Sequence, residues 1–223
     1  MRIAILQFPT SNCEPEMALA IEKANMQPIN FSEPKMLTQL SGCDGTLILD
    51  YFNDSLLFEI LQEQNLEGKP ILGLGDGART LVAAGLVPGV GENEVCVDIT
   101  PYSSDSALSH IRLIEDYQYN AFTRLTSLKI LRVEATHQFQ MPIGLLKEIQ
   151  IQGMDVFHYC SADGTLQENI AALANKVGNV MAVAAKFNQP QHLEILFRSM
   201  HDYFVAGHTQ DVTPLFYFPR FLK

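Results

Sequence analysis

The feature that most constrains this chain is the alternation, through its first half, of short apolar runs with segments of helical periodicity. The apolar runs are residues 2–7, 28–31, 46–49 and 70–74. Continuous apolar runs of this length are typical of parallel strands that are covered on both faces. Their order, with a helix between successive strands, predicts an α/β fold with a doubly wound, mainly parallel sheet.

The segments between these runs have helical spacing. Residues 14–25 place Met17 and Ile21 on one face, which predicts an amphipathic helix. Asn53 or Asp54 is expected to cap a second helix that runs to about residue 65. A third helix is predicted over residues 78–84, because a glycine and then a proline follow it.

The second half has a different pattern. Strand-like runs with little helix between them predict an antiparallel excursion at about residues 95–135. Residues 154–159 and 180–185 are predicted strands, and Gly178-Asn179 is a turn signal between two strand candidates. A closing helix is predicted over residues 193–204.

Length and composition limit the classes of function. The 223 residues are enough for a single α/β domain, 1–223, in which about 207–223 form an aromatic C-terminal tail. A net charge of −10 argues against nucleic-acid binding, because phosphate backbones repel such a surface. No apolar run reaches the roughly 20 residues that span a bilayer, so we expect no membrane association and a cytoplasmic protein.

Five segments, in chain order, resemble the glutaminase subunit of phosphoribosylformylglycinamidine synthase, a class I glutamine amidotransferase. The opening Phe8-Pro9-Thr10-Ser11-Asn12-Cys13 is similar to that family's Phe-Pro-Gly-Ser-Asn-Cys. Gly73-Leu74-Gly75-Asp76-Gly77 stands where the family has Gly-Ile-Cys-Asn-Gly. The other matches are Ala84-Gly85-Leu86-Val87-Pro88-Gly89, residues 163–171 and Gly178-Asn179-Val180-Met181.

The resemblance implies a flavodoxin-like amidotransferase fold, glutamine hydrolysis, and ammonia delivery to a large ATP-dependent synthase subunit as partner. Hydrolysis in this family needs a thiolate on a sharp turn between a strand and a helix. The corresponding turn is present here, but the nucleophile position is Gly75, which has no side chain.

The other two parts of the family's catalytic site are also altered. Counting on from the Gly178-Asn179 match, the position of the base falls on Lys186 and that of its orienting Glu falls on Asn188. A protonated lysine cannot accept a proton. The family's Pro-Gly-Gly-Phe oxyanion loop is replaced by residues that include Asp50, Tyr51 and Phe52. We therefore predict no glutaminase activity.

Some polar residues near these segments allow two interpretations. Asp76 is interpreted as a helix-capping residue rather than a displaced nucleophile. His137 matches a family histidine in a loop directed toward the synthase, so His137 and Phe139 are candidate partner contacts, with an ordinary surface histidine as the alternative.

Neither a metal nor a cofactor is expected. The four cysteines form no Cys-x-x-Cys pair, and Cys13 is interpreted as an apolar filler. His158 and Cys160 alternate along one predicted strand, but two candidate ligands do not make a site. The glycines at 73, 75 and 77 lack the Lys of a phosphate-binding loop.

Three functions stay open from the sequence. The first is a catalytically silent subunit that still docks on the synthase as a structural or regulatory partner. The second is an independent small-molecule binder or hydrolase that reuses the remnant pocket around Asp50, Gly75, Asp76 and Lys186. The third is a glutaminase with relocated catalytic groups.

Overall fold

The first half of the chain builds the parallel part of the sheet, as predicted. The computed structural model describes residues 1–8, 15–31, 37–90, 96–102, 110–114, 120–124, 130–187 and 189–206. In it the parallel strands lie in the order β2-β1-β3-β4-β11. Strands β3 and β4 are buried along their whole length, which explains their continuous apolar sequences. The bounds are β1 Arg2–Leu6, β2 Gln27–Phe31, β3 Gly45–Ile48, β4 Ile71–Leu74 and β11 Val180–Val183.

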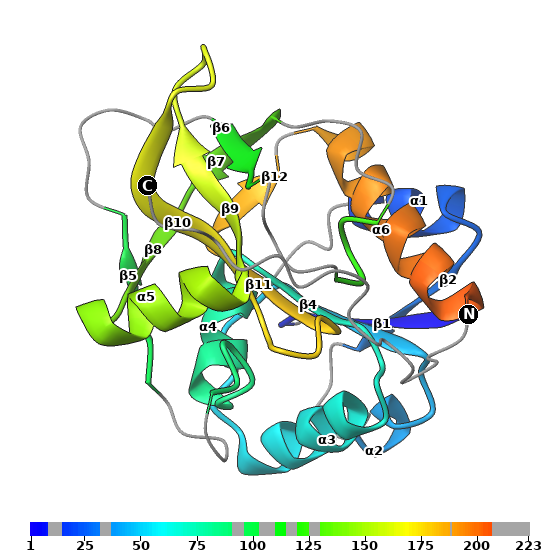
Figure 1. Ribbon diagram of the computed structural model, residues 1–223. Helices are drawn as coiled ribbons and strands as arrows, with labels where there is room; N and C mark the ends of the chain where they lie inside the picture. The colour runs from blue at the N-terminus through cyan, green and yellow to red at the C-terminus, as the bar shows by residue number, and fades with distance from the viewer. Residues whose placement is uncertain are drawn as a thin grey trace.

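Helices cover both faces of this sheet (Figure 1). On one face α1 and α6 pack together over a core that includes Leu47, and on the other α2, α3, α4 and α5 cover a core that includes Ile48. The predicted cap is Asp54, whose carboxylate accepts the N–H of Leu57 at 2.9 Å. The bounds are α1 Pro15–Lys23, α2 Leu37–Leu40, α3 Ser55–Leu66, α4 Asp76–Ala83, α5 Ile143–Gln152 and α6 Pro190–Val205.

The antiparallel part of the sheet is larger than the predicted excursion at about residues 95–135. It continues through β9 and β10, so the ten-stranded sheet is mixed. The turn at Gly178-Asn179 joins β10 to β11, and β10 is not among the predicted strands. A separate pair, β5 with β8, lies beside β10. The bounds are β5 Asp98–Pro101, β6 His110–Leu113, β7 Ile130–Ala135, β8 His137–Gln140, β9 Asp155–Cys160 and β10 Leu166–Ala174.

The predicted strand at residues 180–185 divides at Ala184. Strand β11 before it is parallel to β4, whereas β12 (Ala185–Phe187) after it is antiparallel to β7 at the other end of the antiparallel part. The antiparallel strands must therefore curl round until β7 meets the continuation of β11. This curl brings the end of β7 close to the end of β4, where the glycine-containing turn at residues 73–77 lies.

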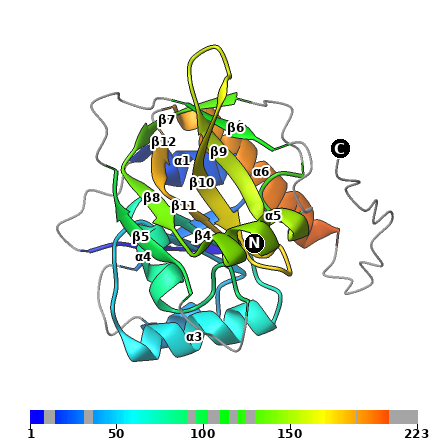
Figure 2. The same ribbon diagram turned by 60° about the vertical axis from the view of Figure 1, so that its left-hand side comes forward.

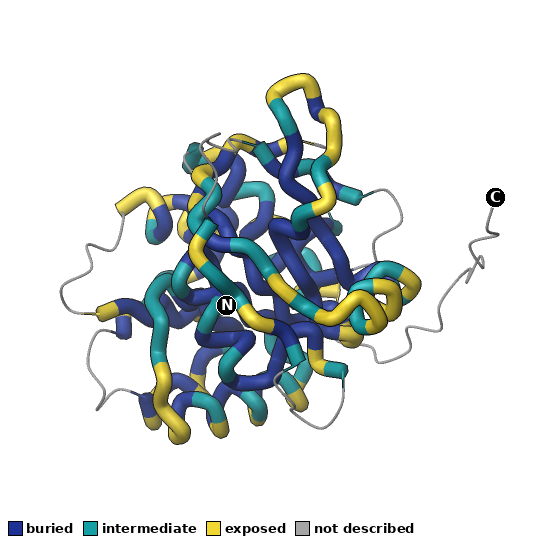
Figure 3. The backbone as a smooth tube through the Cα atoms, turned by 90° about the vertical axis from the view of Figure 1, so that its left-hand side faces the viewer, coloured by how far each residue is buried: buried dark blue, intermediate teal, exposed yellow. Residues whose placement is uncertain are grey.

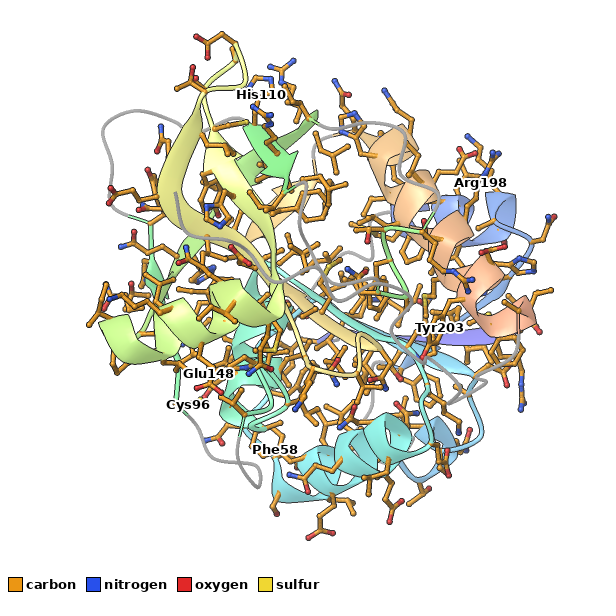
Figure 4. The ribbon with its side chains drawn as sticks, viewed as in Figure 1. Phe58, Cys96, His110, Glu148, Arg198 and Tyr203 are labelled. Carbon is orange, nitrogen blue, oxygen red and sulfur yellow. The ribbon has the colours of Figure 1, made fainter. Side chains whose placement is uncertain are left out.

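The β9–β10 hairpin and the outer helices form the exposed parts of the molecule. The β9–β10 hairpin projects beyond the sheet, and its tip is exposed (Figures 2 and 3). Arg198 and Tyr203 come from α6 and Phe58 from α3, on opposite faces of the sheet (Figure 4). None of the helices in the described ranges combines the length and apolar character that crossing a membrane requires.

Candidate functional site

The turn between β4 and α4 has the sharp geometry that the sequence motif predicts. Gly75 has φ 57° and ψ −114°, a conformation that side chains disfavour and glycine adopts readily. Its N–H donates to the carbonyl of Val183 on β11 at 2.9 Å. A Cβ on Gly77 would overlap the carbonyl of Ile48, so α4 packs directly against the end of β3. The backbone of the elbow is intact.

Lys186 lies over this elbow. A Cβ on Gly75 would lie 3.2 Å from Cγ and 3.3 Å from Cε of Lys186, and 3.6 Å from Oγ1 of Thr136. The structure thus brings together Gly75 and Lys186, which the motif alignment placed at the nucleophile and base positions. Lys186 is exposed on β12 and stands opposite Glu134 of β7. Asn188 lies outside the described residues.

The loop after β3 is held by hydrogen bonds to α4 and to the segment after β1. The hydroxyl of Thr80 donates to the carbonyl of Asp50 at 3.0 Å and accepts the N–H of Phe52 at 2.9 Å. The carboxylate of Asp50 accepts the N–H of Phe8 at 2.6 Å, and the rings of Phe8 and Phe52 are 4.7 Å apart. Since Thr80 occupies the N–H of Phe52, that group is not available to a developing oxyanion.

Asp76 contacts side chains beside the elbow. It is the first residue of α4, which confirms its predicted position at the helix start, but Gly75 occupies the N-cap position, so the predicted capping role is wrong. Its Oδ1 lies 3.3 Å from Nη1 of Arg79 and 3.5 Å from Nε2 of His137. Arg79 in turn stacks on the ring of Tyr51, with 4.3 Å between Cζ and the ring centroid. Tyr51 and Asp76 are therefore linked through one guanidinium group.

His137 is buried, which corrects its interpretation as an ordinary surface histidine. Its side chain is 8% exposed, because the β7–β8 junction packs under Ala184 and Tyr159. Nδ1 lies 3.0 Å from the hydroxyl of Thr136. Burial lowers the pKa of His137, the charges of Arg79 and Lys186 lower it further, and Asp76 opposes them. A neutral imidazole is therefore favoured at neutral pH.

Two polar residues of this cluster were missed in the sequence. Arg79 follows Asp76 by three residues, a spacing at which helical side chains meet, so this pair had a readable signal. Thr136 had none, because its position depends on the pairing of β7 with β12. Phe139, the other candidate partner contact, is half-buried and packs against the core under α2–α5.

The other candidate ligands are placed apart from the elbow. His158 contacts Asp155 at 3.1 Å and the carbonyl of Gln167 at 3.2 Å. Burial raises the pKa of the Cys160 thiol, and Cys13 is outside the described residues. Across the part of the chain that the structure describes, no three His, Cys, Asp or Glu side chains gather to hold a metal ion.

Comparison with solved structures agrees with the elbow and the sheet in defining the fold. The chain has the fold of the class I glutamine amidotransferases. The structure of PurLQS from Thermotoga maritima matches with a TM-score of 0.59 at 16% identity, over 91% of this chain and 98% of that one. A glutamine amidotransferase from the same organism matches with a TM-score of 0.58 at 13% identity, over 92% and 98%.

In sequence, the chain is similar to one particular protein of that fold, the phosphoribosylformylglycinamidine synthase subunit PurQ. PurQ of Methanothrix thermoacetophila is 26% identical over 82% of this chain and 84% of its own length. PurQ of Zymomonas mobilis is 26% identical over 82% and 87%. No protein-family model matches the chain.

Proposed function

We propose that this protein is a PurQ-like subunit that does not hydrolyse glutamine and that docks on a large phosphoribosylformylglycinamidine synthase subunit as a structural or regulatory partner. The observation that carries the proposal is the pair formed by Gly75 and Lys186. The elbow keeps the backbone geometry of a nucleophile turn, yet the space beside its glycine is filled by the aliphatic chain of Lys186.

The loop after β3 supports the loss of glutaminase chemistry. Hydrolysis of an amide develops negative charge on the carbonyl oxygen, which needs preorganised N–H donors. The N–H of Phe52 is bonded to Thr80, and the carboxylate of Asp50 lies on the same loop. Hydrogen bonds to Thr80 of α4 and to Phe8 hold this loop in place, and it offers a substrate oxygen little stabilisation.

The docking role rests on the relatives and on exposed apolar surface. The PurQ relatives are by name subunits of the synthase, and the PurLQS structure matches this fold. Helix α5 exposes Ile143 at 70% and Ile151 at 67%, eight residues apart on one side of the helix. Large exposed apolar side chains at this spacing suit a protein contact. The aromatic C-terminal tail, at about residues 207–223, lies outside the described residues.

The test combines mass in solution with an activity assay. The chain is mixed at micromolar concentration with the large synthase subunit from the same cell, with nucleotide and substrate present, and the masses are measured. We expect one complex and no glutamate release from glutamine. Ile143→Glu with Ile151→Glu should weaken the complex.

Leu66→Glu is the matched control, because Leu66 is 81% exposed on α3, away from α5, and its replacement should leave the complex intact. Two separate species with the unaltered chain would overturn the docking role. If the chain releases glutamate from glutamine and replacement of Asp76 abolishes that release, the proposed absence of glutaminase activity is wrong.

A further inference from the structure

A hydroxyl, an imidazole and a carboxylate converge beside the elbow. Oγ1 of Thr136 lies 3.0 Å from Nδ1 of His137, and Nε2 of the same ring lies 3.5 Å from Oδ1 of Asp76. The second distance is long for a hydrogen bond, but catalytic contacts are often long in the absence of substrate. Such a set of groups is recognised by geometry and role rather than by position in the sequence.

The surrounding hydrogen bonds assign the protons. The carboxylate of Asp76 can only accept a hydrogen bond, so Nε2 of His137, 3.5 Å from its Oδ1, carries the ring proton. Nδ1 is then an acceptor, and the hydroxyl of Thr136 has two acceptors within reach, Nδ1 at 3.0 Å and the carbonyl of Ala184 at 3.2 Å. The ring proton sits on Nε2 and faces Asp76, so the imidazole presents a basic nitrogen to the hydroxyl.

The fold places this hydroxyl where a nucleophile is missing. Thr136 follows β7, whose pairing with β12 swings it to the end of β4. Its Oγ1 is 3.6 Å from the point where a Cβ on Gly75 would stand. Helix α4 begins at this elbow. The N–H of Ala78 donates to the carbonyl of Gly75 at 3.2 Å, and the N–H groups before it have no carbonyl partner within the helix. They are suitable donors to an oxyanion.

We propose that Thr136, His137 and Asp76 form a hydroxyl-based acyl-transfer site that acts on small activated carboxylic esters. The proposal goes beyond the docking role and does not depend on it. An ester with a good leaving group is the fitting class of substrate, because the N–H of Phe52 is occupied and oxyanion stabilisation is limited. Glutamine, whose amide leaves poorly, stays outside this class.

The reaction balances in two steps. Oγ1 of Thr136 attacks the ester carbonyl while its proton passes to Nδ1 of His137, and the tetrahedral intermediate expels the alcohol, which takes that proton. Water then attacks the acyl-threonine, His137 accepts a proton from it and returns it to Oγ1, and the carboxylic acid leaves. Asp76 stabilises the imidazolium that forms in each step.

The experiment uses the full chain with two probes, a fluorophosphonate and p-nitrophenyl acetate. Mass spectrometry of the labelled chain should place the phosphonate on Thr136. Thr136→Val and His137→Gln should each lower ester turnover roughly a hundredfold or more, whereas Thr136→Ser, which keeps the hydroxyl, should retain labelling. Thr38→Val replaces an exposed threonine far along the chain and serves as control.

Thermal unfolding of each variant separates lost activity from lost folding. Labelling of Thr136 that requires His137 in folded protein supports the site. The proposal is overturned if folded wild-type protein carries no label on Thr136, or if ester turnover is equal in wild type, Thr136→Val and His137→Gln. Neither result bears on complex formation with the synthase subunit, so the two proposals fail separately.

Discussion

The aliphatic chain of Lys186 lies where the side chain of a nucleophile at residue 75 would stand, with Cγ at 3.2 Å and Cε at 3.3 Å from the Cβ position of Gly75. In the family that the motifs resemble, these two positions hold a cysteine and a histidine that act together. Here the two replacements are sterically complementary: a glycine leaves space, and a long side chain fills it.

Gly75→Cys alone should therefore not restore glutamine hydrolysis. A cysteine must displace the chain of Lys186 and adopt a φ of 57°, and it still lacks both a histidine at residue 186 and the N–H of Phe52. General base catalysis and oxyanion stabilisation each contribute orders of magnitude. We expect glutamate release at least about a thousandfold below that of an intact PurQ.

Gly75→Cys with Lys186→His is the informative companion to that variant. It restores two groups but leaves the loop of Asp50 and Phe52 closed by Thr80, so turnover should still stay far below that of an intact glutaminase subunit. Glutamate release from the single variant at the level of an intact relative would contradict the account of the site.

Gly77→Ala should destabilise the fold by about 3 kcal/mol or more, because its Cβ would overlap the carbonyl of Ile48, and backbone cannot move aside cheaply. Gly144→Ala is the matched control. No atom lies within 4 Å of a Cβ there, so the change should be neutral or stabilise α5 by up to about 1 kcal/mol. Urea unfolding measures both, and equal effects would refute the close approach of α4 to β3.

The parallel half of the fold was readable from the sequence, and part of the antiparallel half was not. Strands buried on both faces, such as β3 and β4, are continuous apolar runs bounded by turns. Strand β10 begins with alternating exposed and half-buried residues and pairs irregularly with β9, so its pattern is weak. Helix α5 was missed because Ile143 and Ile151 face outward and no single apolar stripe forms.

Some features of the candidate site could also be predicted from the sequence, and others could not. Gly75 and Lys186 were found by counting along motifs, since both stand at fixed offsets from recognisable turns. Thr136 and the burial of His137 depend on how β7 meets β12 after the sheet curls, a contact between residues about 50 positions apart that no local pattern encodes. The pairing of β7 with β12 also places His137 beside Asp76, a neighbour that helix-capping rules do not predict.

Asn179→Ala should destabilise the protein by about 2–4 kcal/mol. Asn179 is fully buried, and its amide donates to the carbonyls of Asn65 and Lys69 at 3.1 Å each, tying the β10–β11 turn to the end of α3. Asn169→Ala removes a single half-buried contact to Gln138 and should cost less than about 1 kcal/mol. Equal losses in urea unfolding would show that the turn is not held this way.

Lowering the pH should destabilise the fold through two buried histidines. Burial lowers the pKa of His137 and of His192 from the ordinary value of 6.5. The unfolded chain therefore binds protons at a higher pH than the folded one, and the free energy of unfolding falls as the pH drops through 6.5 toward the lower folded pKa. Urea unfolding should show less stability at about pH 5.5 than at about pH 7.5.

Variants assign that pH dependence to the two rings. Nδ1 of His192 accepts the N–H of Arg132 at 3.3 Å, whereas His137 faces Asp76, Arg79 and Lys186. His137→Gln and His192→Gln should each flatten the change between those two pH values, since glutamine does not titrate, and the double variant should flatten it most. Glu148→Gln, an exposed change on α5, should leave it unaltered. If the single histidine variants keep the full pH dependence, protonation of these rings is not its source, and the neutral imidazole assigned to His137 is wrong.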